Sequence, residues 1–471
     1  MKKLTFILFI SVAFVICSYT FAQEATDTKD MEMWQGTLKA PGVELRVVFN
    51  ISKDQDGKLT ATLDSIDQGV KGIPVETVRI ENGNAHFEVK SVNGSFDGKF
   101  KDSNTIEGEW KQSGVSLPLV LNRTDKKPEI QRPQEPIKPY PYLEEEVVYE
   151  NKSAGIKLAG TLTMPESGGL FPAVLLISGS GPEDRNETVF GHRPFLVLAD
   201  YLTRQGVAVL RTDDRGVGGS TGDFSQAVTD DFASDAIAGV EYLKSRNEIN
   251  PKQIGLIGHS EGGLIAPIAA TQSPDVAFIV LMAGTGLTGE EIINLQSALI
   301  SKAMGVKDED IAKNKAIQEQ IFAVVKQEND KAVIDKKIRE IIENAVAGLS
   351  EAEKKAAMAP YESQAQFISS PWFKNFLTYD PKPTLMKVKC PVFAINGEKD
   401  LQVPPKENLS AIEEALKAGG NEHYTIKELP GLNHLFQTAQ TGSPAEYAKI
   451  EETISPTALK TIGDWILEQV K

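Results

Sequence analysis

The stretch "IGLIGHSEGGLIAPIAA", residues 254–270, decides the fold of the larger part of the chain. One apolar run leads into Ser260 and a second apolar run of small residues follows it. The pentapeptide at 258–262, Gly-His-Ser-Glu-Gly, is typical of a strained turn between a buried strand and a helix, because its glycines let the turn pass close to its neighbours. Such a turn raises the serine hydroxyl above the sheet, which makes Ser260 a candidate nucleophile.

Around this stretch, apolar runs alternate with helical segments from Leu143 onward. Continuous apolar strands separated by helices indicate a mostly parallel sheet covered by helices on both faces. The sequence therefore predicts an α/β domain built on a mostly parallel sheet over residues 143–471. The apolar runs are "FPAVLLISGSG", "GVAVLRTDD", "QIGLIGHS", "VAFIVLMAG" and "CPVFAINGEKD", with helical stretches such as "DDFASDAIAGVEYLKSR" between them.

One segment, from about 288 to 381, interrupts the alternation of strands and helices. It is rich in Lys, Glu, Ala and Ile, and its apolar residues recur at helical spacing at Ile334, Ile338, Ile341 and Ile342. A helical insertion between two strands is most simply a cap over the ends of the sheet.

The N-terminal part of the chain has a different pattern. Residues 23–125 alternate apolar and polar positions between Gly, Asn and Asp turns, which predicts a small antiparallel β domain, a barrel or a sandwich. Residues 126–142 follow with five prolines between Pro128 and Pro141, which favours an extended linker.

The first 22 residues read as a cleavable secretory signal. Lys2 and Lys3 precede an apolar core, and Thr20-Phe21-Ala22 is a plausible cleavage site. We therefore expect a periplasmic or extracellular protein that does not span a membrane. Cleavage would leave Cys390 as the single thiol, which excludes an intramolecular disulfide.

The net charge of the chain limits the classes of partner that it can bind. A formal net charge of −15 argues against nucleic acid and against anionic membrane surfaces. Nothing in the sequence calls for a cofactor or a metal, and the oligomeric state is left open.

Two further side chains follow strands in a suggestive order. Asp400 follows "PVFAINGEK", and His434 lies in "ELPGLNHLF" after the next strand. His434 would act as general base toward Ser260, and Asp400 would orient the imidazole. Glu398 is the alternative acid, and we favour Asp400 because it lies farther into the loop. The order Ser, Asp, His is that of α/β hydrolases.

Backbone N–H groups would complete the site as an oxyanion hole. The Glu261 N–H lies at the start of the helix after the nucleophile, and a second donor is expected from the Ser178-Gly179-Ser180-Gly181 loop, with Ser180 preferred over Gly181. This loop lacks the Lys and Ser/Thr of a nucleotide-binding site. The "TDDRG" residues Asp213, Asp214 and Arg215 are interpreted as an ion-pair network rather than as a metal or phosphate site.

Taken together, residues from about 143 to the end resemble serine hydrolases of the α/β-hydrolase superfamily, in particular the bacterial esterase and serine-aminopeptidase-like branch. The resemblance rests on "SGSGPEDRN", "HRPFLVLADYLTRQGVAVLRTDDRGVGGSTG", "GHSEGG", "NGEKDLQVPP" and "GLNHLFQ". It implies Ser260 as nucleophile, Asp400 as acid and His434 as base. Where many relatives begin the oxyanion loop with His-Gly, this chain has Ser178-Gly179.

Three functions follow from this pattern. The first is hydrolysis of small-molecule carboxylic esters through an acyl-enzyme, with Gly181, Trp372, Phe373 and Phe376 as candidates for the substrate pocket. The second is removal of N-terminal residues from short peptides, which needs acidic side chains that hold the substrate ammonium. Glu183, Asp184 and Glu261 are candidates by position only, and no clear amine-anchoring pattern is visible, so the ester is favoured. The third is an inactive hydrolase that serves as a secreted binding protein, against which the intact Ser, Asp and His argue.

Overall fold

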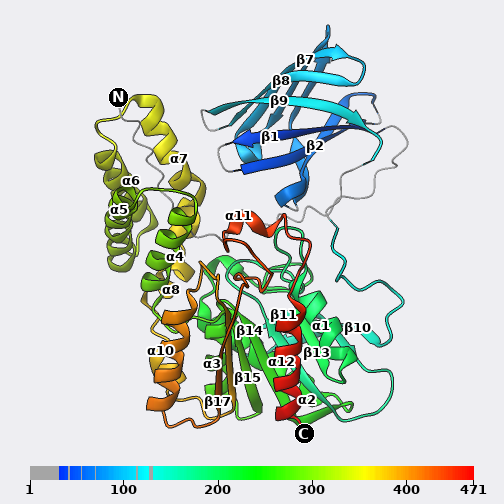
Figure 1. Cartoon of the computed structure of the whole chain (residues 1–471), viewed down its shortest axis with the longest axis vertical. Helices are drawn as coiled ribbons and strands as arrows, with labels where there is room; N and C mark the ends of the chain where they lie inside the picture. The colour runs from blue at the N-terminus through cyan, green and yellow to red at the C-terminus, as the bar shows by residue number, and fades with distance from the viewer. Residues whose placement is uncertain (1–30, 41–42, 55, 69, 113–114, 127–130) are drawn as a thin grey trace.

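A computed structural model describes residues 31–471 except 41–42, 55, 69, 113–114 and 127–130. The signal segment expected at residues 1–22 lies outside the described residues. Two β-sheets organise the described chain, sheet A in the N-terminal part and sheet B in the remainder (Figure 1).

Sheet A is antiparallel throughout, and its strands lie in the order β4-β3-β2-β1-β9-β8-β7-β6-β5. Its two ends approach each other, since β3 contacts β5 and β4 contacts β6, so the sheet curls into a barrel-like domain. The strands are β1 (Glu32–Ala40), β2 (Val43–Lys53), β3 (Leu59–Ser65), β4 (Val70–Val75), β5 (Thr77–Glu81), β6 (Asn84–Val89), β7 (Gly94–Asp102), β8 (Thr105–Gln112) and β9 (Val115–Thr124), with short 3-10 helices at Ile66–Gln68 and Lys90–Val92.

Alternation of buried and solvated side chains explains this barrel. In β6, Ala85, Phe87 and Val89 are buried while the residues between them are partly exposed. The inward side chains form a separate core in which Phe49 lies between Phe87 and Trp110. Of the two architectures expected from the sequence, the barrel is the one observed.

Sheet B has the order β10-β11-β13-β12-β14-β15-β16-β17. The pairs β10/β11 and β11/β13 are antiparallel, and the remaining pairs are parallel. The α/β-hydrolase fold expected from the sequence is confirmed. The strands are β10 (Leu143–Asn151), β11 (Ile156–Met164), β12 (Phe171–Ile177), β13 (Ala208–Thr212), β14 (Ile249–His259), β15 (Val276–Met282), β16 (Val392–Gly397) and β17 (Tyr424–Leu429).

Helices cover both faces of sheet B, which explains its continuous apolar strands. In β15, Ile279 and Leu281 join the core under α2, α3 and α10, whereas Phe278 and Val280 join the core under α1 and α12. The helices outside the cap are α1 (Pro194–Arg204), α2 (Thr229–Ser245), α3 (Gly262–Gln272), α9 (Lys382–Leu385), α10 (Pro405–Ala418), α11 (Pro444–Tyr447) and α12 (Pro456–Gln469), with a 3-10 turn at Phe224–Gln226.

Five of the helices between β15 and β16 form one body beside the sheet (Figure 1). They are α4 (Gly289–Ala303), α5 (Asp308–Gln327), α6 (Lys331–Ala345), α7 (Glu351–Ile368) and α8 (Pro371–Thr378). The apolar stripe seen in the sequence faces inward on α6, where Ile334, Ile338 and Ile342 are buried. None of the helices in the described part of the chain is long and apolar enough to cross a membrane.

The segment that joins the two sheets is tied to the hydrolase fold. Arg132 donates hydrogen bonds to the carbonyl oxygens of Phe190, Gly191, Ala448 and Ile450 at 2.8–3.2 Å. The described part of the proline-rich segment is therefore anchored to two loops of the larger domain.

Candidate active site

Ser260 lies between the last residue of β14 and the first turn of α3, at the carboxyl edge of sheet B. Its φ is 53°, a left-handed conformation that is uncommon outside glycine. Its N–H donates to Met282 O at 2.9 Å, and its own carbonyl accepts from Gly263 N at 2.9 Å. The flanking hydrogen bonds hold the serine in this strained turn.

The two glycines of the pentapeptide are required by close backbone contacts. A Cβ on Gly258 would lie 1.9 Å from the Gly262 carbonyl oxygen, and one on Gly262 would lie 2.3 Å from the Ile177 carbonyl oxygen. A side chain at Gly258 would push the end of β14 away from the start of α3, and one at Gly262 would push the turn away from β12. The spacing Gly-x-Ser-x-Gly is thus a steric requirement of this elbow.

Asp400 and His434 come together in the loops after β16 and β17. Asp400 Oδ2 lies 2.7 Å from His434 Nδ1, and both side chains are fully buried. Asp400 Oδ1 accepts from the N–H groups of Gln402 and Val403 at 2.8 and 2.9 Å, which fixes the carboxylate. Glu398, the alternative acid, is exposed and accepts instead from Gly431 N.

His434 is connected to the nucleophile turn through the residue before Ser260. The rings of His259 and His434 have centroids 4.8 Å apart, and His259 Nε2 lies 3.0 Å from the His434 carbonyl oxygen. The structure therefore brings Ser260, Asp400 and His434 to one edge of the sheet, as their order in the sequence predicts.

A cavity of about 40 Å³ opens beside Ser260. By size it holds a few water molecules or a small acyl group. Side chains of the cap form much of the apolar wall of this cavity. Gln296 and Gln402 form its polar end, where Gln296 Nε2 lies 3.3 Å from Gln402 Oε1. The lining residues are Ser180, Ser260, Glu261, Thr285, Ile292, Ile293, Gln296, Trp372, Phe376, Gln402 and Val403.

Two residues expected at the pocket do not line this cavity. Trp372 and Phe376 are four residues apart on α8 and their rings stack at 5.0 Å, so they share one face. Phe373 is on the adjacent face, where it is fully buried and packs edge-on against Phe322 of α5. Gly181 lines a neighbouring cavity instead.

The carboxylate of Glu261 is buried beside the nucleophile and links three elements. It accepts from Trp372 Nε1 of α8 at 2.8 and 3.0 Å and from Thr229 Oγ1 of α2 at 3.0 Å. Burial raises the pKa of this carboxyl, while hydrogen bonds from Trp372, Thr229 and Ser180 oppose the rise. The side chain of Glu261 thus ties the cap to the turn whose backbone N–H is the expected oxyanion donor.

The loop after β12 carries Ser180 to the same cavity. A Cβ on Gly179 would lie 3.3 Å from Ser260 Cβ, so this loop passes directly beside the nucleophile. Ser180 and Glu261 both line the cavity with Ser260. This placement suits the two backbone N–H donors proposed from the sequence.

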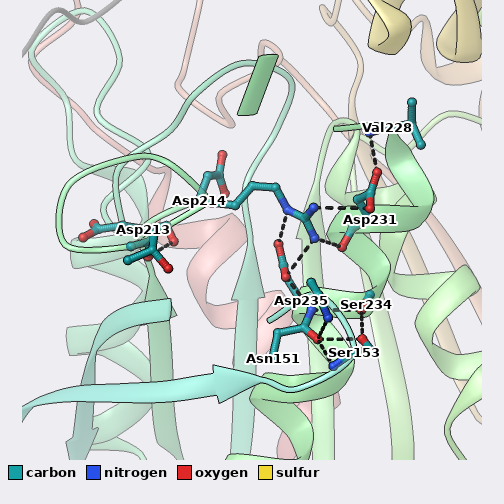
Figure 2. A network of polar contacts seen from close by, with 12 residues as sticks. Asn151, Ser153, Asp213, Asp214, Val228, Asp231, Ser234 and Asp235 are labelled. Atoms are coloured by element: carbon teal, nitrogen blue, oxygen red, sulfur yellow. Dashed lines mark hydrogen bonds and ion pairs between the residues drawn. The ribbon is translucent and has the colours of Figure 1, made fainter. Parts of the chain in front are cut away.

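Two of the "TDDRG" residues, Asp213 and Arg215, form ion pairs, as interpreted from the sequence, whereas the Asp214 carboxyl accepts hydrogen bonds from Ser178 and Glu183 (Figure 2). Arg215 pairs with Asp235 at 2.7 Å and with Asp231 at 3.2 Å, both on α2. Asp213 pairs with Arg185 at 2.8 Å. Among the described residues, no group of three or more His, Cys, Asp or Glu side chains could hold a metal ion.

Asp214 is buried within this region beneath the oxyanion loop. Its carboxylate accepts from Ser178 Oγ at 2.9 Å and from Glu183 N at 3.0 Å. Burial raises the pKa of Asp214 to about 8, against which these hydrogen bonds act. The loop that carries Ser180 is therefore held by hydrogen bonds to a buried carboxyl group whose pKa is raised.

Sequence reasoning missed Gln402 and Glu187. Gln402 binds Asp400 through its N–H and lines the cavity with its side chain. Glu187 accepts from Gly179 N and from His259 Nδ1, both at 2.8 Å. Gln402 lies within "NGEKDLQVPP" and Glu187 directly follows "SGSGPEDRN", but neither stretch shows by itself that these side chains reach the site. The folding of separate loops brings them there.

Comparison with known proteins agrees with this geometry. The sequence profile of the X-Pro dipeptidyl-peptidase (S15) family matches residues 154–428, more than half of the chain. Esterase EstD of Thermotoga maritima is 24% identical over 387 residues, which cover 82% of this chain and 81% of EstD.

Solved structures of esterases are also similar to this chain. The Pyrococcus furiosus esterase Pf2001 is 18% identical with a TM-score of 0.42, covering 73% of this chain and 98% of Pf2001. Est1E of Butyrivibrio proteoclasticus, solved with ferulic acid bound, is 18% identical with a TM-score of 0.39, covering 69% of this chain and 99% of Est1E.

Proposed function

The chain belongs to the X-Pro dipeptidyl-peptidase (S15) family and is a serine hydrolase with an α/β-hydrolase fold, and we propose that it cleaves small carboxylic esters through an acyl-enzyme on Ser260. One observation carries this proposal. Ser260 is held at a φ of 53° in a strand–turn–helix elbow and faces a cavity between the sheet and the cap. This is the conformation that a nucleophile elbow imposes on its serine.

In the proposed reaction, Ser260 Oγ attacks the ester carbonyl and His434 Nε2 takes its proton. Asp400 accepts from His434 Nδ1, which leaves Nε2 as the basic nitrogen and stabilises the imidazolium that forms. The imidazolium then protonates the leaving alcohol. Water, deprotonated by His434, hydrolyses the acyl-enzyme and restores Ser260.

The negative charge that develops on the carbonyl oxygen would be bound by the N–H groups of Glu261 and Ser180. The Glu261 N–H also benefits from the positive end of the α3 dipole. Removing one such donor from a hydrolase typically costs about 3–4 kcal/mol of transition-state stabilisation.

Peptide hydrolysis is the second candidate, because the family profile is named for X-Pro dipeptidyl-peptidases. Such an activity needs an acidic side chain available to the substrate ammonium. Asp184 is engaged by the N–H groups of Asn186 and Thr188, and Glu261 is engaged by Trp372 and Thr229. Burial, with the nearby charge of Glu187, raises the pKa of Glu183, the third candidate, which weakens its ability to carry the negative charge that an ammonium needs. The hydrogen bonds of Asp184 and Glu261 and the raised pKa of Glu183 favour the ester over the peptide.

Purified protein assayed on acetyl esters, longer acyl esters and X-Pro aminoacyl amides tests this choice. We expect turnover of the short esters and little turnover of the amides. Amide hydrolysis that exceeds ester hydrolysis would overturn the esterase assignment. A Ser260→Ala variant, prepared in the same way, controls for contaminating hydrolases.

Export by a cleavable signal at residues 1–22 is also proposed. Its support is the order of a basic start, an apolar core and a small-residue cleavage site in the sequence. N-terminal sequencing of the protein from the cell envelope or the medium should begin at Gln23. A chain that retains Met1 in the cytosol would contradict the proposal.

A further inference from the structure

A buried ion pair lies directly behind the nucleophile and takes no part in the reaction described above. Glu187 Oε1 is 2.8 Å from His259 Nδ1, and their side chains are only 6% and 5% exposed. Glu187 comes from the loop between β12 and α1, and His259 is the last residue of β14. The pair therefore joins the oxyanion loop region to the nucleophile strand.

The two partners of His259 define its protonation. Nδ1 faces the Glu187 carboxylate and Nε2 faces the His434 carbonyl oxygen at 3.0 Å. An ionised Glu187 and a carbonyl oxygen are both acceptors, so the two contacts are satisfied together when both ring nitrogens carry a proton. Burial disfavours the charged ring, but the Glu187 charge and hydrogen bond outweigh it and raise the pKa of His259.

The same carboxylate oxygen also holds the oxyanion loop. Glu187 Oε1 accepts from Gly179 N at 2.8 Å, one residue before Ser180. Glu187 reaches this position only with a left-handed φ of 51°, which is unfavourable for a non-glycine residue. Such strain is characteristic of residues fixed for function.

We propose that Glu187 and His259 are positioning residues for catalysis. Through three hydrogen bonds they fix the oxyanion loop at Gly179, the nucleophile strand at His259 and the base loop at His434 relative to one another. They touch neither substrate nor reacting atoms. This inference rests on the proposed function, because it assumes that Ser260 and His434 carry out the reaction.

Three substitutions of Glu187 separate position from charge. Glu187→Gln keeps a carbonyl oxygen at the same reach and removes the charge. Glu187→Asp keeps the charge but withdraws the oxygen by one methylene, and Glu187→Ala removes the acceptor. Glu398→Ala is a matched control, since Glu398 also accepts from a glycine N–H but is exposed.

The readouts are kcat and KM on an acetyl ester, the rate of inactivation by a fluorophosphonate, and the melting temperature. We expect Glu187→Ala to lose about 100-fold in kcat and in inactivation rate with little change in KM, as misplacement by about 1 Å can cause. Glu187→Gln should keep most of the activity and Glu187→Asp should fall between them. Glu398→Ala should match the wild type.

Two results would overturn the inference. The first is a folded Glu187→Ala variant with a lowered melting temperature but the kcat of the wild type, which would show a packing role only. The second is a Glu187→Asp variant at least as active as Glu187→Gln, a comparison that decides the matter even when the alanine variant fails to fold. An active Ser260→Ala variant would instead refute the proposed function itself.

Discussion

Asp400 and Glu398 lie two residues apart but make different contacts. Asp400 binds the ring of His434, whereas Glu398 faces solvent. Asp400→Asn can place an amide donor against Nδ1 and favour the wrong tautomer, so we expect kcat to fall by about 10⁴-fold. Glu398→Gln should leave kcat unchanged. Steady-state kinetics on an acetyl ester checks both, and a larger loss in Glu398→Gln would contradict the assignment.

Asp214 gives a prediction about pH and stability. Its pKa is raised from 3.8 to about 8, so between these values the folded protein holds a proton that the unfolded chain has released. The contribution of Asp214 to stability is therefore present at low pH and is lost as pH rises toward 8. The free energy of unfolding of Asp214→Asn, relative to that of the wild type, should therefore be larger at about pH 9 than at about pH 5. Denaturant midpoints at both pH values test this, and a pH-independent difference would contradict it.

At the scale of elements, the two phenylalanines of helix α8 have different roles. Phe376 lines the cavity beside Ser260, whereas Phe373 packs within the cap. Phe376→Ala should shift the preference among acyl chains toward longer ones, because it enlarges the cavity. Phe373→Ala should cost about 3–5 kcal/mol of stability without changing the preference. The ratio of kcat/KM for hexanoyl and acetyl esters measures the effect, and equal ratios in the two variants would refute the assignment.

Sequence patterns predicted the elements better than the direction of individual side chains. The order of strands placed Ser260, Asp400 and His434, because the carboxyl ends of parallel strands share one edge of the sheet. The sequence offered Trp372, Phe373 and Phe376 as pocket residues, but it did not show which face of α8 meets the site. That choice depends on how the cap packs against the sheet, which is a tertiary property.

At the scale of the whole molecule, Arg132 is one of several polar links between the proline-rich segment and the hydrolase domain, beside Gln134 and Glu135. Arg132→Ala would leave four carbonyl oxygens without this donor. We expect a loss of about 1–3 kcal/mol of stability and faster proteolysis near residue 132. Lys138→Ala, an exposed change in the same segment, is the control. Equal proteolysis rates in the two variants would contradict the role of Arg132.

The architecture of the two domains could be predicted from the alternation of apolar and polar residues in the first and from the continuous apolar runs in the second. The polar contacts between residues far apart in the sequence could not be predicted in this way. Glu187 and His259 are 72 residues apart and Arg132 and Ile450 are 318 apart. The residues next to such partners in the sequence do not identify them, because a loop Glu that becomes buried cannot be distinguished by sequence from one that stays on the surface. Their roles appear only once the loops are folded against one another.

The central claim is that Ser260 is the nucleophile, and labelling with a fluorophosphonate followed by peptide mass spectrometry tests it most directly. A single adduct on the peptide that contains Ser260 is predicted, absent in Ser260→Ala and formed much more slowly in His434→Ala. The absence of labelling in the folded wild-type protein, or an adduct on another residue, would contradict the account.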